Sequence, residues 1–395
     1  MDSRIVAVEV ERVEQSLWGV FWEIQRSAPC SSPMSRYAAY SGSLESWWWP
    51  QAVVLVRVTA DSGHSGIGWA EDGVAAASGA IEHHLSRFLI GANPLEAQSL
   101  WDQMYRASIP YGRKGAVIDA ISAVDLALWD LLGKMAGQPV YRLLGGPSKP
   151  SVKAYASHLH PVEMKKFVEE AAAYVDEGFT AMKMRMPGHP ALGRKGIEMN
   201  VDRVRAVRET VGDDIDIMVD AYMGWDLNFA VQMARSLEPF RVSWIEEPLI
   251  PDEIGAYAEL RSKSGIPIST GEHEFTRYGF EELLRRGACD IVQPDIHRAG
   301  GFTELRRIAA MADAAGVPLI PHAYSAPTVH FVAATGAPMV ERLTVPVWVK
   351  DPPAPNPVIL GEPDVVGGYA QLTDAPGLGV TINADLLPRL AHWND

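Results

Sequence analysis

Three carboxylates recur at equal intervals in the middle of the chain, each closing an apolar run: Asp220, Glu246 and Glu272. Both intervals, 220 to 246 and 246 to 272, are 26 residues long, the length of one strand, one helix and two loops. This spacing predicts three successive βα units of a barrel, each presenting a carboxylate at the same end of its strand. One carboxylate after a strand is commonly a helix cap, but three at one barrel mouth favour a site for a hard cation.

Two basic side chains, Lys183 and Arg185, end an earlier strand-like run. Strand side chains alternate with period two, so both point to the same side. Two cations at the barrel mouth suit an anionic substrate, and ion pairing to the carboxylates inside the barrel is the alternative. The same alternation puts Glu246 and Glu247 on opposite sides, so only one of them is a ligand. The period alone leaves open which.

An acid/base pair is predicted from Asp295 and His322, which end consecutive strand-like runs. They can be neighbours on adjacent strands, where a carboxylate on one imidazole nitrogen fixes the tautomer and raises the basicity of the other nitrogen. Three further histidines have no evident partner and are interpreted as structural or solvated: His189, His297 and His330. The run Trp47-Trp48-Trp49-Pro50 either packs a domain junction or lines a pocket.

The elements that must position these residues begin at residue 152, where apolar runs alternate with amphipathic helical stretches. The runs are VKAYASH, TAMKMRM, DIMVDAY, VSWIEEP, IPISTGE, DIVQPDI and PLIPHAY. Successive βα units imply a parallel sheet, and closure into a barrel leaves no open edge. An open doubly wound sheet is the alternative, but no GxGxxG or GxxxxGK[ST] phosphate loop supports it.

The first 130 or so residues predict a smaller α+β domain. Residues 4–10, 52–59 and 65–70 read as strands, and 80–136 reads as helical. The Pro- and Gly-rich tail, 351–395, breaks the barrel period, and we expect it to return and pack on the first domain.

Composition narrows the class of protein. The chain has 395 residues, 47% hydrophobic and 21% charged, with a formal net charge of −14. The sequence contains no run of clustered Lys and Arg, which argues against a nucleic-acid or anionic-membrane partner. The two cysteines, Cys30 and Cys289, are too few for a disulfide framework and are expected to be free thiols. The amino terminus lacks an apolar signal region, so we expect a cytoplasmic protein.

Longer motifs resemble the enolase superfamily, specifically its mandelate-racemase-like sugar-acid dehydratases of the L-rhamnonate dehydratase type. They are AISAVDLALWDLLGKMAGQPVYRLLGG at 120–146, PGLGV at 376–380, SPMSRY at 32–37, DQMYRA at 102–107, AYMGWDLNFA at 221–230, and SWIEEPLIPDE, STGEHE, DIVQPD and GGFTEL. The resemblance implies a modified (β/α)7β TIM barrel. It would comprise an α+β capping domain at 1–130, the catalytic barrel at 131–350 and a tail at 351–395 that completes the capping domain.

The resemblance also implies roles for the strand-end residues. The Mg²⁺ ligands would be Asp220, Glu246 and Glu272, which selects the first glutamate of the pair. The acid/base pair would be Asp295 and His322. The substrate would be bound by His273, Lys183 and Arg185, the last two also being candidates for a part in catalysis.

Two departures from the relatives matter. Rhamnonate enzymes carry a histidine just before SPMSRY, where this chain has Ala28-Pro29-Cys30-Ser31. The second barrel strand reads Lys183-Met184-Arg185, where racemase-type members have a second lysine. Because arginine stays protonated and is a poor base, a two-base racemase mechanism is disfavoured.

The predicted function is Mg²⁺-dependent dehydration of a monosaccharide acid. His322 would take the proton from C2 and return it to the hydroxyl leaving C3, which gives a 2-keto-3-deoxy acid by syn elimination. Racemisation, epimerisation or cycloisomerisation through the same enediolate is the alternative, and a non-catalytic sugar-acid binding protein is a remote one. L-rhamnonate and L-lyxonate are candidate substrates, chosen by first-domain segments 18–34 and 45–50. The resemblance further implies a homo-oligomer, from dimer to octamer.

Overall fold

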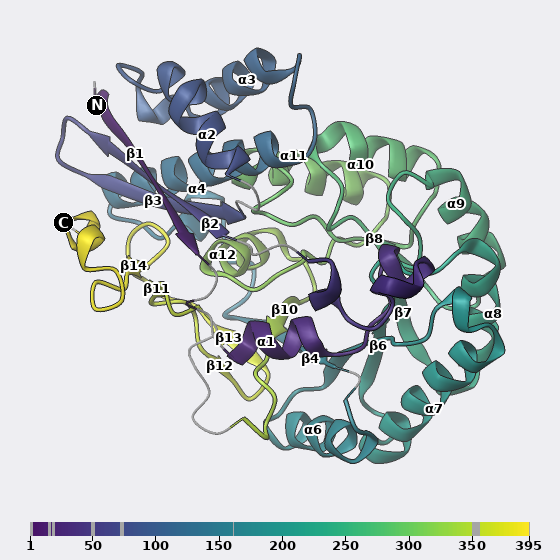
Figure 1. Cartoon of the computed structure of the whole chain (residues 1–395). Coiled ribbons are helices and arrows are strands. Elements are labelled where there is room, and N and C mark those ends of the chain that lie inside the picture. Colours follow the sequence, from purple (N-terminus) through teal and green to yellow (C-terminus); the bar gives the residue numbers. More distant parts are fainter. Residues whose placement is uncertain are drawn as a thin grey trace.

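A three-stranded antiparallel sheet with helices on one face stands beside a ring of parallel strands enclosed by helices (Figure 1). The computed structural model describes residues 3–14, 17, 20–48, 52–71, 75–160, 162–349 and 356–394. Trp18, Trp49 and Pro50, which belong to the segments expected to set specificity, lie outside the described residues. The ring of strands excludes the open doubly wound alternative.

The amino-terminal sheet has the order β1-β2-β3, with strands β1 (Ile5–Glu14), β2 (Ala52–Ala60) and β3 (Ser65–Glu71). Its helices are α2 (Ala76–His83), α3 (Ala97–Ser108) and α4 (Ala116–Ala136). Helix α4 lies directly on β3 because Gly68 has no side chain: a Cβ there would stand 2.2 Å from the carbonyl oxygen of Ala123. We call this sheet with its helices the capping domain.

The barrel strands follow in order. They are β4 (Ser151–Leu159), β5 (Ala181–Arg185), β6 (Asp216–Asp220), β7 (Val242–Glu246), β8 (Ile268–Thr270) and β9 (Ile291–Val292), with β10 (Val340–Leu343) paired in parallel to β4. The predicted strand PLIPHAY is present only as isolated bridges, Val292 to Leu319 and Asp295 to His322. These bridges nevertheless hold that segment beside β9, which brings His322 to the same strand-end level as its neighbours.

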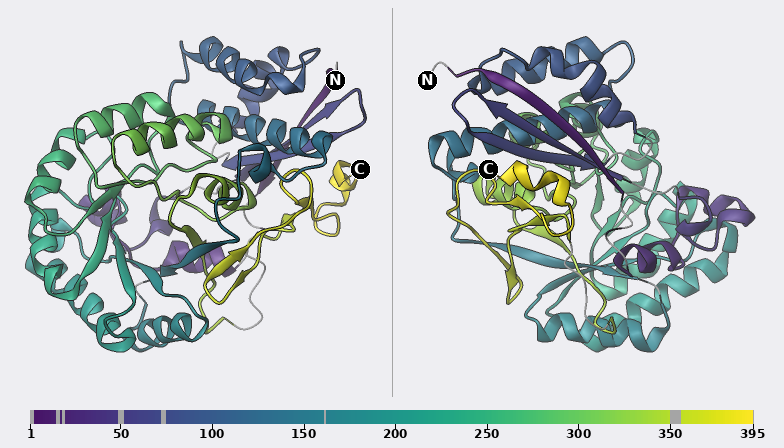
Figure 2. Two further views of the ribbon diagram at one scale, coloured as in Figure 1. Left: turned by 180° about the vertical axis from the view of Figure 1, so that it is seen from behind. Right: turned by 60° about the vertical axis from the view of Figure 1, so that its left-hand side comes forward.

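Helices surround the ring of strands (Figures 1 and 2). They are α6 (Met164–Asp176), α7 (Arg194–Val211), α8 (Leu227–Leu237), α9 (Ile254–Lys263), α10 (Thr276–Arg285), α11 (Gly301–Ala314) and α12 (Ala326–Thr335). The short α5 (Val140–Leu143) leads into β4, and α1 (Val20–Ser27) precedes the segment that docks on the barrel. In that segment, Ser31 donates from its backbone N–H to Met186 O and from its hydroxyl to Ala221 O, both at 2.7 Å.

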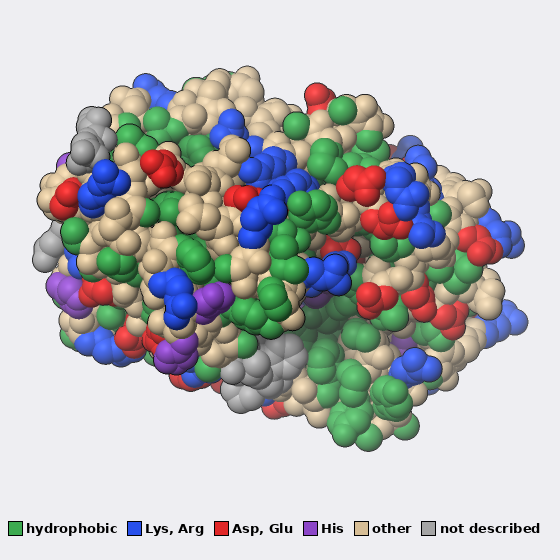
Figure 3. Space-filling model, turned by 90° about the horizontal axis from the view of Figure 1, so that it is seen from above, with side chains coloured by type: hydrophobic (Ala, Val, Ile, Leu, Met, Phe, Trp, Pro, Cys, Tyr) green, Lys and Arg blue, Asp and Glu red, His purple; other side chains and the backbone are tan. Residues whose placement is uncertain are grey.

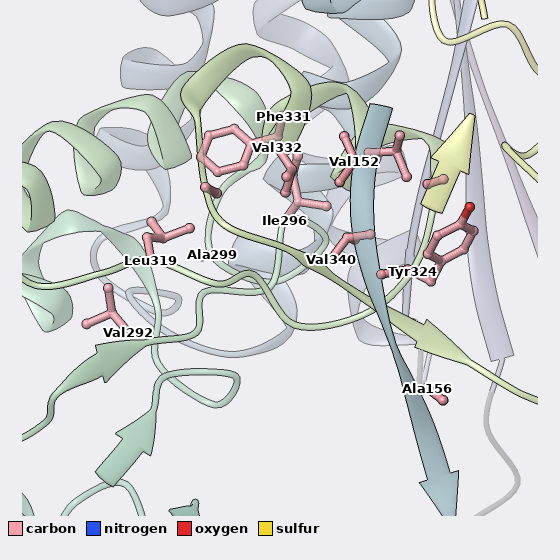
Figure 4. Close-up of a cluster of buried hydrophobic side chains, with 14 of the residues drawn as sticks. Val152, Ala156, Val292, Ile296, Ala299, Leu319, Tyr324, Phe331, Val332 and Val340 are labelled. Atoms are coloured by element: carbon pink, nitrogen blue, oxygen red, sulfur yellow. The ribbon is translucent and has the colours of Figure 1, made fainter. Parts of the chain in front are cut away.

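Apolar side chains between the strands and helices form the core of the barrel. Figure 4 shows one part of it, where Val152 and Val340 from β4 and β10 lie near Phe331 and Val332 of α12. All four side chains are buried. Burial of apolar area of this kind supplies the main driving force that fixes the strand ends in one plane.

The tail runs back along the barrel toward the capping domain (Figure 2, right). Its strands are β11 (Ile359–Leu360), β12 (Val365–Val366), β13 (Tyr369–Gln371) and β14 (Thr381–Ile382). Strand β13 pairs with β4, and β11 with β14. Beyond them, Arg389 contacts Glu11 on β1, and His392 lies 3.3 Å from Glu9 of the same strand.

The surface carries charged side chains of both signs. Seen from above, side chains of both signs are spread over the surface, with one group of Lys and Arg near its centre (Figure 3). Cys30 and Cys289 are buried free thiols, as the sequence predicted. None of the described helices is long and apolar enough to cross a membrane.

Candidate active site

Strand register places the predicted carboxylates at one level of the barrel. Asp220, the last residue of β6, is paired with Glu246, the last residue of β7, and also with Arg185 at the end of β5. Glu272 follows β8, after Gly271, whose φ of 134° is a conformation that suits glycine. The even spacing in the sequence thus corresponds to adjacent strand ends in space.

The three carboxylates are almost completely buried, at 1%, 1% and 4% exposure for Asp220, Glu246 and Glu272. Asp220 Oδ1 accepts from the backbone N–H of Tyr222 at 2.8 Å, whereas its buried Oδ2 has no hydrogen-bond partner. Burial, together with the neighbouring carboxylates and against the opposing charge of Lys183, raises the pKa of Glu246 to about 7. Oxygen donors that repel one another, with one buried oxygen unpaired, fit a divalent hard cation.

The two adjacent glutamates do face different partners, as strand alternation predicted. Glu246 Oε2 accepts from Trp244 Nε1 at 3.0 Å and from Gln293 Nε2 at 2.8 Å. Glu247 Oε2 instead lies 2.6 Å from Nδ1 of His273. Among the described residues, Glu247, Glu272 and His273 place one ligand atom each within 4.8 Å of one another, so geometry leaves both glutamates as possible metal ligands.

Lys183 and Arg185 have different environments. Lys183 Nζ contacts Glu246 Oε1 and lies 2.9 Å from Glu341 Oε1, so the ion-pair alternative describes it. Arg185 Nε stands 3.7 Å from Asp220 Oδ2, and its guanidinium lies 5.0 Å from the Tyr222 ring centroid. Its buried Nη1 has no hydrogen-bond partner, which leaves a donor suited to an anionic oxygen.

His322 and Asp295 form the predicted contact: Nδ1 of the histidine lies 2.8 Å from Oδ2 of the aspartate. The other aspartate oxygen accepts from the backbone N–H of His297 at 2.7 Å. Burial lowers the pKa of His322, but Glu272, Glu341 and Asp295 outweigh it and raise the pKa to about 10. The surrounding carboxylates therefore favour the imidazolium form, and Nε2 of the ring lies 3.4 Å from Glu272 Oε2.

A cavity of about 180 Å³ joins these groups at the strand ends. We call it the strand-end cavity. Its barrel lining includes Arg185, Tyr222, Glu272, Asp295, His297, Arg298, His322 and Tyr324; the capping domain and its loop contribute Trp48, Val53, Trp69 and Glu71; the tail contributes Asn356. Four of the predicted site residues are not among the lining residues: Asp220, Glu246, Lys183 and His273. The cavity is lined by both aromatic and charged side chains.

The loop residues singled out in the sequence fall around this cavity. Trp48 lines it and stacks on Tyr222, with ring centroids 5.9 Å apart, while Trp47 packs beside Trp48. Cys30 belongs to the same buried cluster, where burial raises its thiol pKa to about 11. Cys30 belongs to the segment in which this chain lacks the histidine of the rhamnonate enzymes. This difference in sequence therefore lies next to the strand-end cavity.

The three histidines interpreted from the sequence as structural or solvated are buried: His189, His297 and His330. His297 Nδ1 lies 2.9 Å from Trp69 O, and its Nε2 lies 2.9 Å from Ser325 Oγ. His330 lies between Tyr141 N and Leu378 O, and His189 lines a separate pocket beside Trp225. His297 therefore joins the capping domain to the cavity wall.

Three charged residues of the site were not predicted: Glu341, Arg298 and Glu71. Glu341 lies inside β10, and its Oε2 accepts from Ala323 N at 2.9 Å. The apolar run around VERL carries a buried acid, a signal that could have identified it. Arg298 and Glu71 contact each other from distant parts of the chain, which no local pattern reveals.

Comparisons with known proteins agree with this geometry. The family model "Mandelate racemase / muconate lactonizing enzyme, N-terminal domain" matches residues 48–145, and "Enolase C-terminal domain-like" matches 166–386. An L-rhamnonate dehydratase of Saccharopolyspora erythraea is 40% identical over 370 residues, 92% of each chain.

Two solved structures of sugar-acid enzymes are similar to this chain over nearly its whole length. Rhamnonate dehydratase from Gibberella zeae complexed with Mg has a TM-score of 0.88 and 34% identity, covering 98% of this chain and 95% of that one. The 3,6-anhydro-D-galactonate cycloisomerase from Zobellia galactanivorans has a TM-score of 0.79 and 31% identity, covering 99% of both chains.

Proposed function

Because this chain belongs to the mandelate racemase and muconate lactonizing enzyme family of the enolase superfamily, we infer that it is a Mg²⁺-dependent hydro-lyase that dehydrates a monosaccharide acid. The observation that carries the inference is the contact of His322 with Asp295, with Nε2 of the histidine directed to the buried carboxylate Glu272 inside one cavity. A base, its orienting carboxylate and an acidic cluster are the parts that α-proton abstraction needs.

We propose that His322 carries both proton transfers. Its Nε2 takes the proton from C2 of the acid while Asp295 holds Nδ1 and stabilises the imidazolium. The same Nε2 then protonates the hydroxyl leaving C3, so water departs and an enol remains, which becomes the 2-keto-3-deoxy acid. One residue acting at both carbons requires both to face it, which predicts syn elimination.

The metal ligands we propose are Asp220, Glu246 and Glu272. The assignment is supported by Oδ2 of Asp220, which accepts no hydrogen bond, and by the mutual repulsion of these buried carboxylates. When bound, Mg²⁺ supplies positive charge that stabilises the enediolate formed by loss of the α-proton. Arg185, whose Nη1 has no partner, is suited to bind a substrate oxygen.

The environment of Lys183 argues against a second base. Lys183 is held between Glu246 and Glu341 and is 2% exposed. Burial lowers the pKa of this lysine, but these two carboxylates more than offset the effect and raise it well above its usual value. Lys183 is held by two carboxylates and does not line the strand-end cavity, whereas His322 does, so one-base chemistry is favoured over racemisation.

The substrate we propose is an aldonate, with L-rhamnonate the first candidate because the relatives named above act on it. The aromatic wall formed by Trp48, Trp69 and Tyr324 provides an apolar surface for the distal carbons. We also propose a cytoplasmic homo-oligomer, which fractionation of cells and light scattering of the purified protein would test.

The test is a screen of aldonates and aldarates for 2-keto acid formation, detected with semicarbazide. We expect turnover of at least one aldonate, loss of turnover with a chelator and its recovery with added Mg²⁺. His322→Asn should abolish turnover, with His392→Asn, an exposed histidine on the tail, as the matched control. Exchange of the α-proton in D₂O without keto acid would instead indicate a racemase or epimerase.

A further inference from the structure

We propose that Arg298, held by Glu71 of the capping domain, is a positioning residue for Asp295 and Glu272. The proposal rests on the function inferred above, since it concerns the base pair and the acidic cluster of that site. Neither Arg298 nor Glu71 is needed as a metal ligand or a base in that mechanism. Their place in the strand-end cavity therefore asks for a separate explanation.

Arg298 makes one close ion pair and several longer contacts. Nη2 of Arg298 lies 3.0 Å from Glu71 Oε1. Its Nε lies 3.9 Å from Asp295 Oδ2, and its Nη1 lies 4.0 Å from Glu272 Oε1 and 3.4 Å from that residue's carbonyl oxygen. The guanidinium thus stands between the carboxylate that orients His322 and a carboxylate assigned to the metal, without hydrogen bonding to either carboxylate group.

The restraint comes from the capping domain. Trp69 and Glu71 are two residues apart on β3 and so point to the same side. The carbonyl oxygen of Trp69 meets Nδ1 of His297 at 2.9 Å, and the carboxylate of Glu71 meets Arg298. Two consecutive residues of the barrel loop are therefore held by one edge of the capping sheet.

Helix α4 holds the next residues of the same loop. The backbone N–H of Gly300 donates to Ser122 Oγ at 2.9 Å, and that of Thr303 donates to Asp125 Oδ2 at 3.0 Å. Trp129 Nε1 donates to Thr303 Oγ1 at 3.0 Å. The loop that carries Asp295 and the start of α11 are consequently positioned by the capping domain, and the contact of Glu71 with Arg298 is the one ion pair in this set.

The charges explain why Glu71 is needed. Arg298 is only 15% exposed, so its guanidinium has few water partners and keeps strong attraction to nearby carboxylates. Without Glu71, it can swing onto Asp295 Oδ2, where it competes with His322, or onto Glu272, where it competes with the metal. With Glu71 in place, the guanidinium remains at about 4 Å from both carboxylates and leaves their oxygens to His322 and the metal.

The test is a double-mutant cycle with Glu71→Gln and Arg298→Met, measured for kcat, KM and Mg²⁺ affinity by calorimetry. Loss of outer-shell partners typically costs about 10–100-fold in activity or metal affinity. We expect Glu71→Gln to lower kcat and Mg²⁺ affinity by about tenfold or more, within that range, with KM for the sugar acid little changed. Adding Arg298→Met should raise both again, because the competing guanidinium is gone.

Several outcomes would overturn the proposal. A double variant worse than either single variant would show that the pair is merely structural. A rise in KM alone for Arg298→Met would show that Arg298 binds substrate. Glu9→Gln, which removes the 3.3 Å contact with Arg57 in the same sheet, is the matched control and should change nothing. If a variant fails to fold, Glu71→Asp, which keeps the charge, replaces it and should retain most activity.

The calorimetric arm separates this proposal from the proposed function. If no sugar acid is dehydrated by the wild-type protein, the proposed function fails, whereas Mg²⁺ binding to the four proteins of the cycle still reports the effect of Arg298 on Glu272. Equal Mg²⁺ affinity in all four would count against the positioning role even when the dehydratase is active.

Discussion

Replacing Asp295 by asparagine tests the acid/base pair with little change in shape. In the structure, the aspartate oxygen lies 2.8 Å from Nδ1 of His322, so it accepts the Nδ1 proton and leaves Nε2 free as the base. An amide can donate to Nδ1 instead, which moves the imidazole proton to Nε2 and removes the base from the substrate side. Asp295→Asn is therefore expected to lower activity by changing the tautomer of His322, because the packing of the site is left unchanged.

The expected loss of kcat depends on whether the missing charge of Asp295 or the changed tautomer of His322 has the larger effect. Asp295 is one of three carboxylates that raise the pKa of His322 to about 10, and Glu272 and Glu341 remain beside the imidazole when the charge of Asp295 is removed. The wrong tautomer is more serious: the corresponding change in a Ser-His-Asp triad lowers kcat by about 10⁴. We expect a loss between about 10² and 10⁴, or about 3–5 kcal/mol in the activation free energy.

The assay is keto acid formation, with α-proton exchange in D₂O followed by NMR. Both should fall together, because the same nitrogen removes the proton in each, while Mg²⁺ affinity changes little. Asp102→Asn, on the exposed face of α3, is the control and should keep wild-type rates. Retention of kcat within about threefold by folded Asp295→Asn would refute the assignment of His322 as a base oriented by Asp295.

Three further predictions follow from particular contacts. Glu246→Gln should weaken Mg²⁺ binding measured by calorimetry more than Glu247→Gln does, and the reverse order would reassign the ligand. Gly68→Ala should destabilise the fold by about 3 kcal/mol or more in urea unfolding, since its Cβ would lie 2.2 Å from the carbonyl oxygen of Ala123, and an unchanged midpoint would contradict the close approach of α4. Burial lowers the pKa of His330 from 6.5 to about 4, so the unfolded chain takes up a proton first as the pH falls. The contribution of this histidine is thus fully present above pH 6.5 and declines by about 3 kcal/mol down to pH 4, which urea unfolding of wild-type and His330→Gln proteins between pH 7.5 and 4.5 would detect as a shallower pH dependence in the variant.

Much of the fold followed from local patterns. The alternation of apolar runs with amphipathic stretches predicted the barrel, and the strand-end rule selected Asp220, Glu246 and His322 without structural information. The last predicted strand was less regular than expected, because PLIPHAY contains two prolines, which lack the N–H that a strand ladder needs. Its two bridges still place His322 beside Asp295.

The sequence did not determine which groups Lys183 and Arg185 contact. Period two placed Lys183 and Arg185 on one side, but whether each faces substrate or a carboxylate depends on the strands around it. Glu341, on a strand far along the chain, takes Lys183 out of the cavity, while Arg185 keeps an unpaired nitrogen. An ion pair depends on distances across the barrel, and these are fixed only when the ring closes.

The dehydration itself was implied by the family resemblance, whereas the residues by themselves predicted a cation site and an acid/base pair, from equally spaced carboxylates at strand ends and a histidine and an aspartate on neighbouring strands. These are local features, set by the period of a strand and the length of a βα unit. The tertiary structure alone decided which charges meet. Glu71 reaches Arg298 only because β3 of the capping domain docks over the barrel mouth, so the surroundings of the base are a property of two domains packed together and not of any one segment.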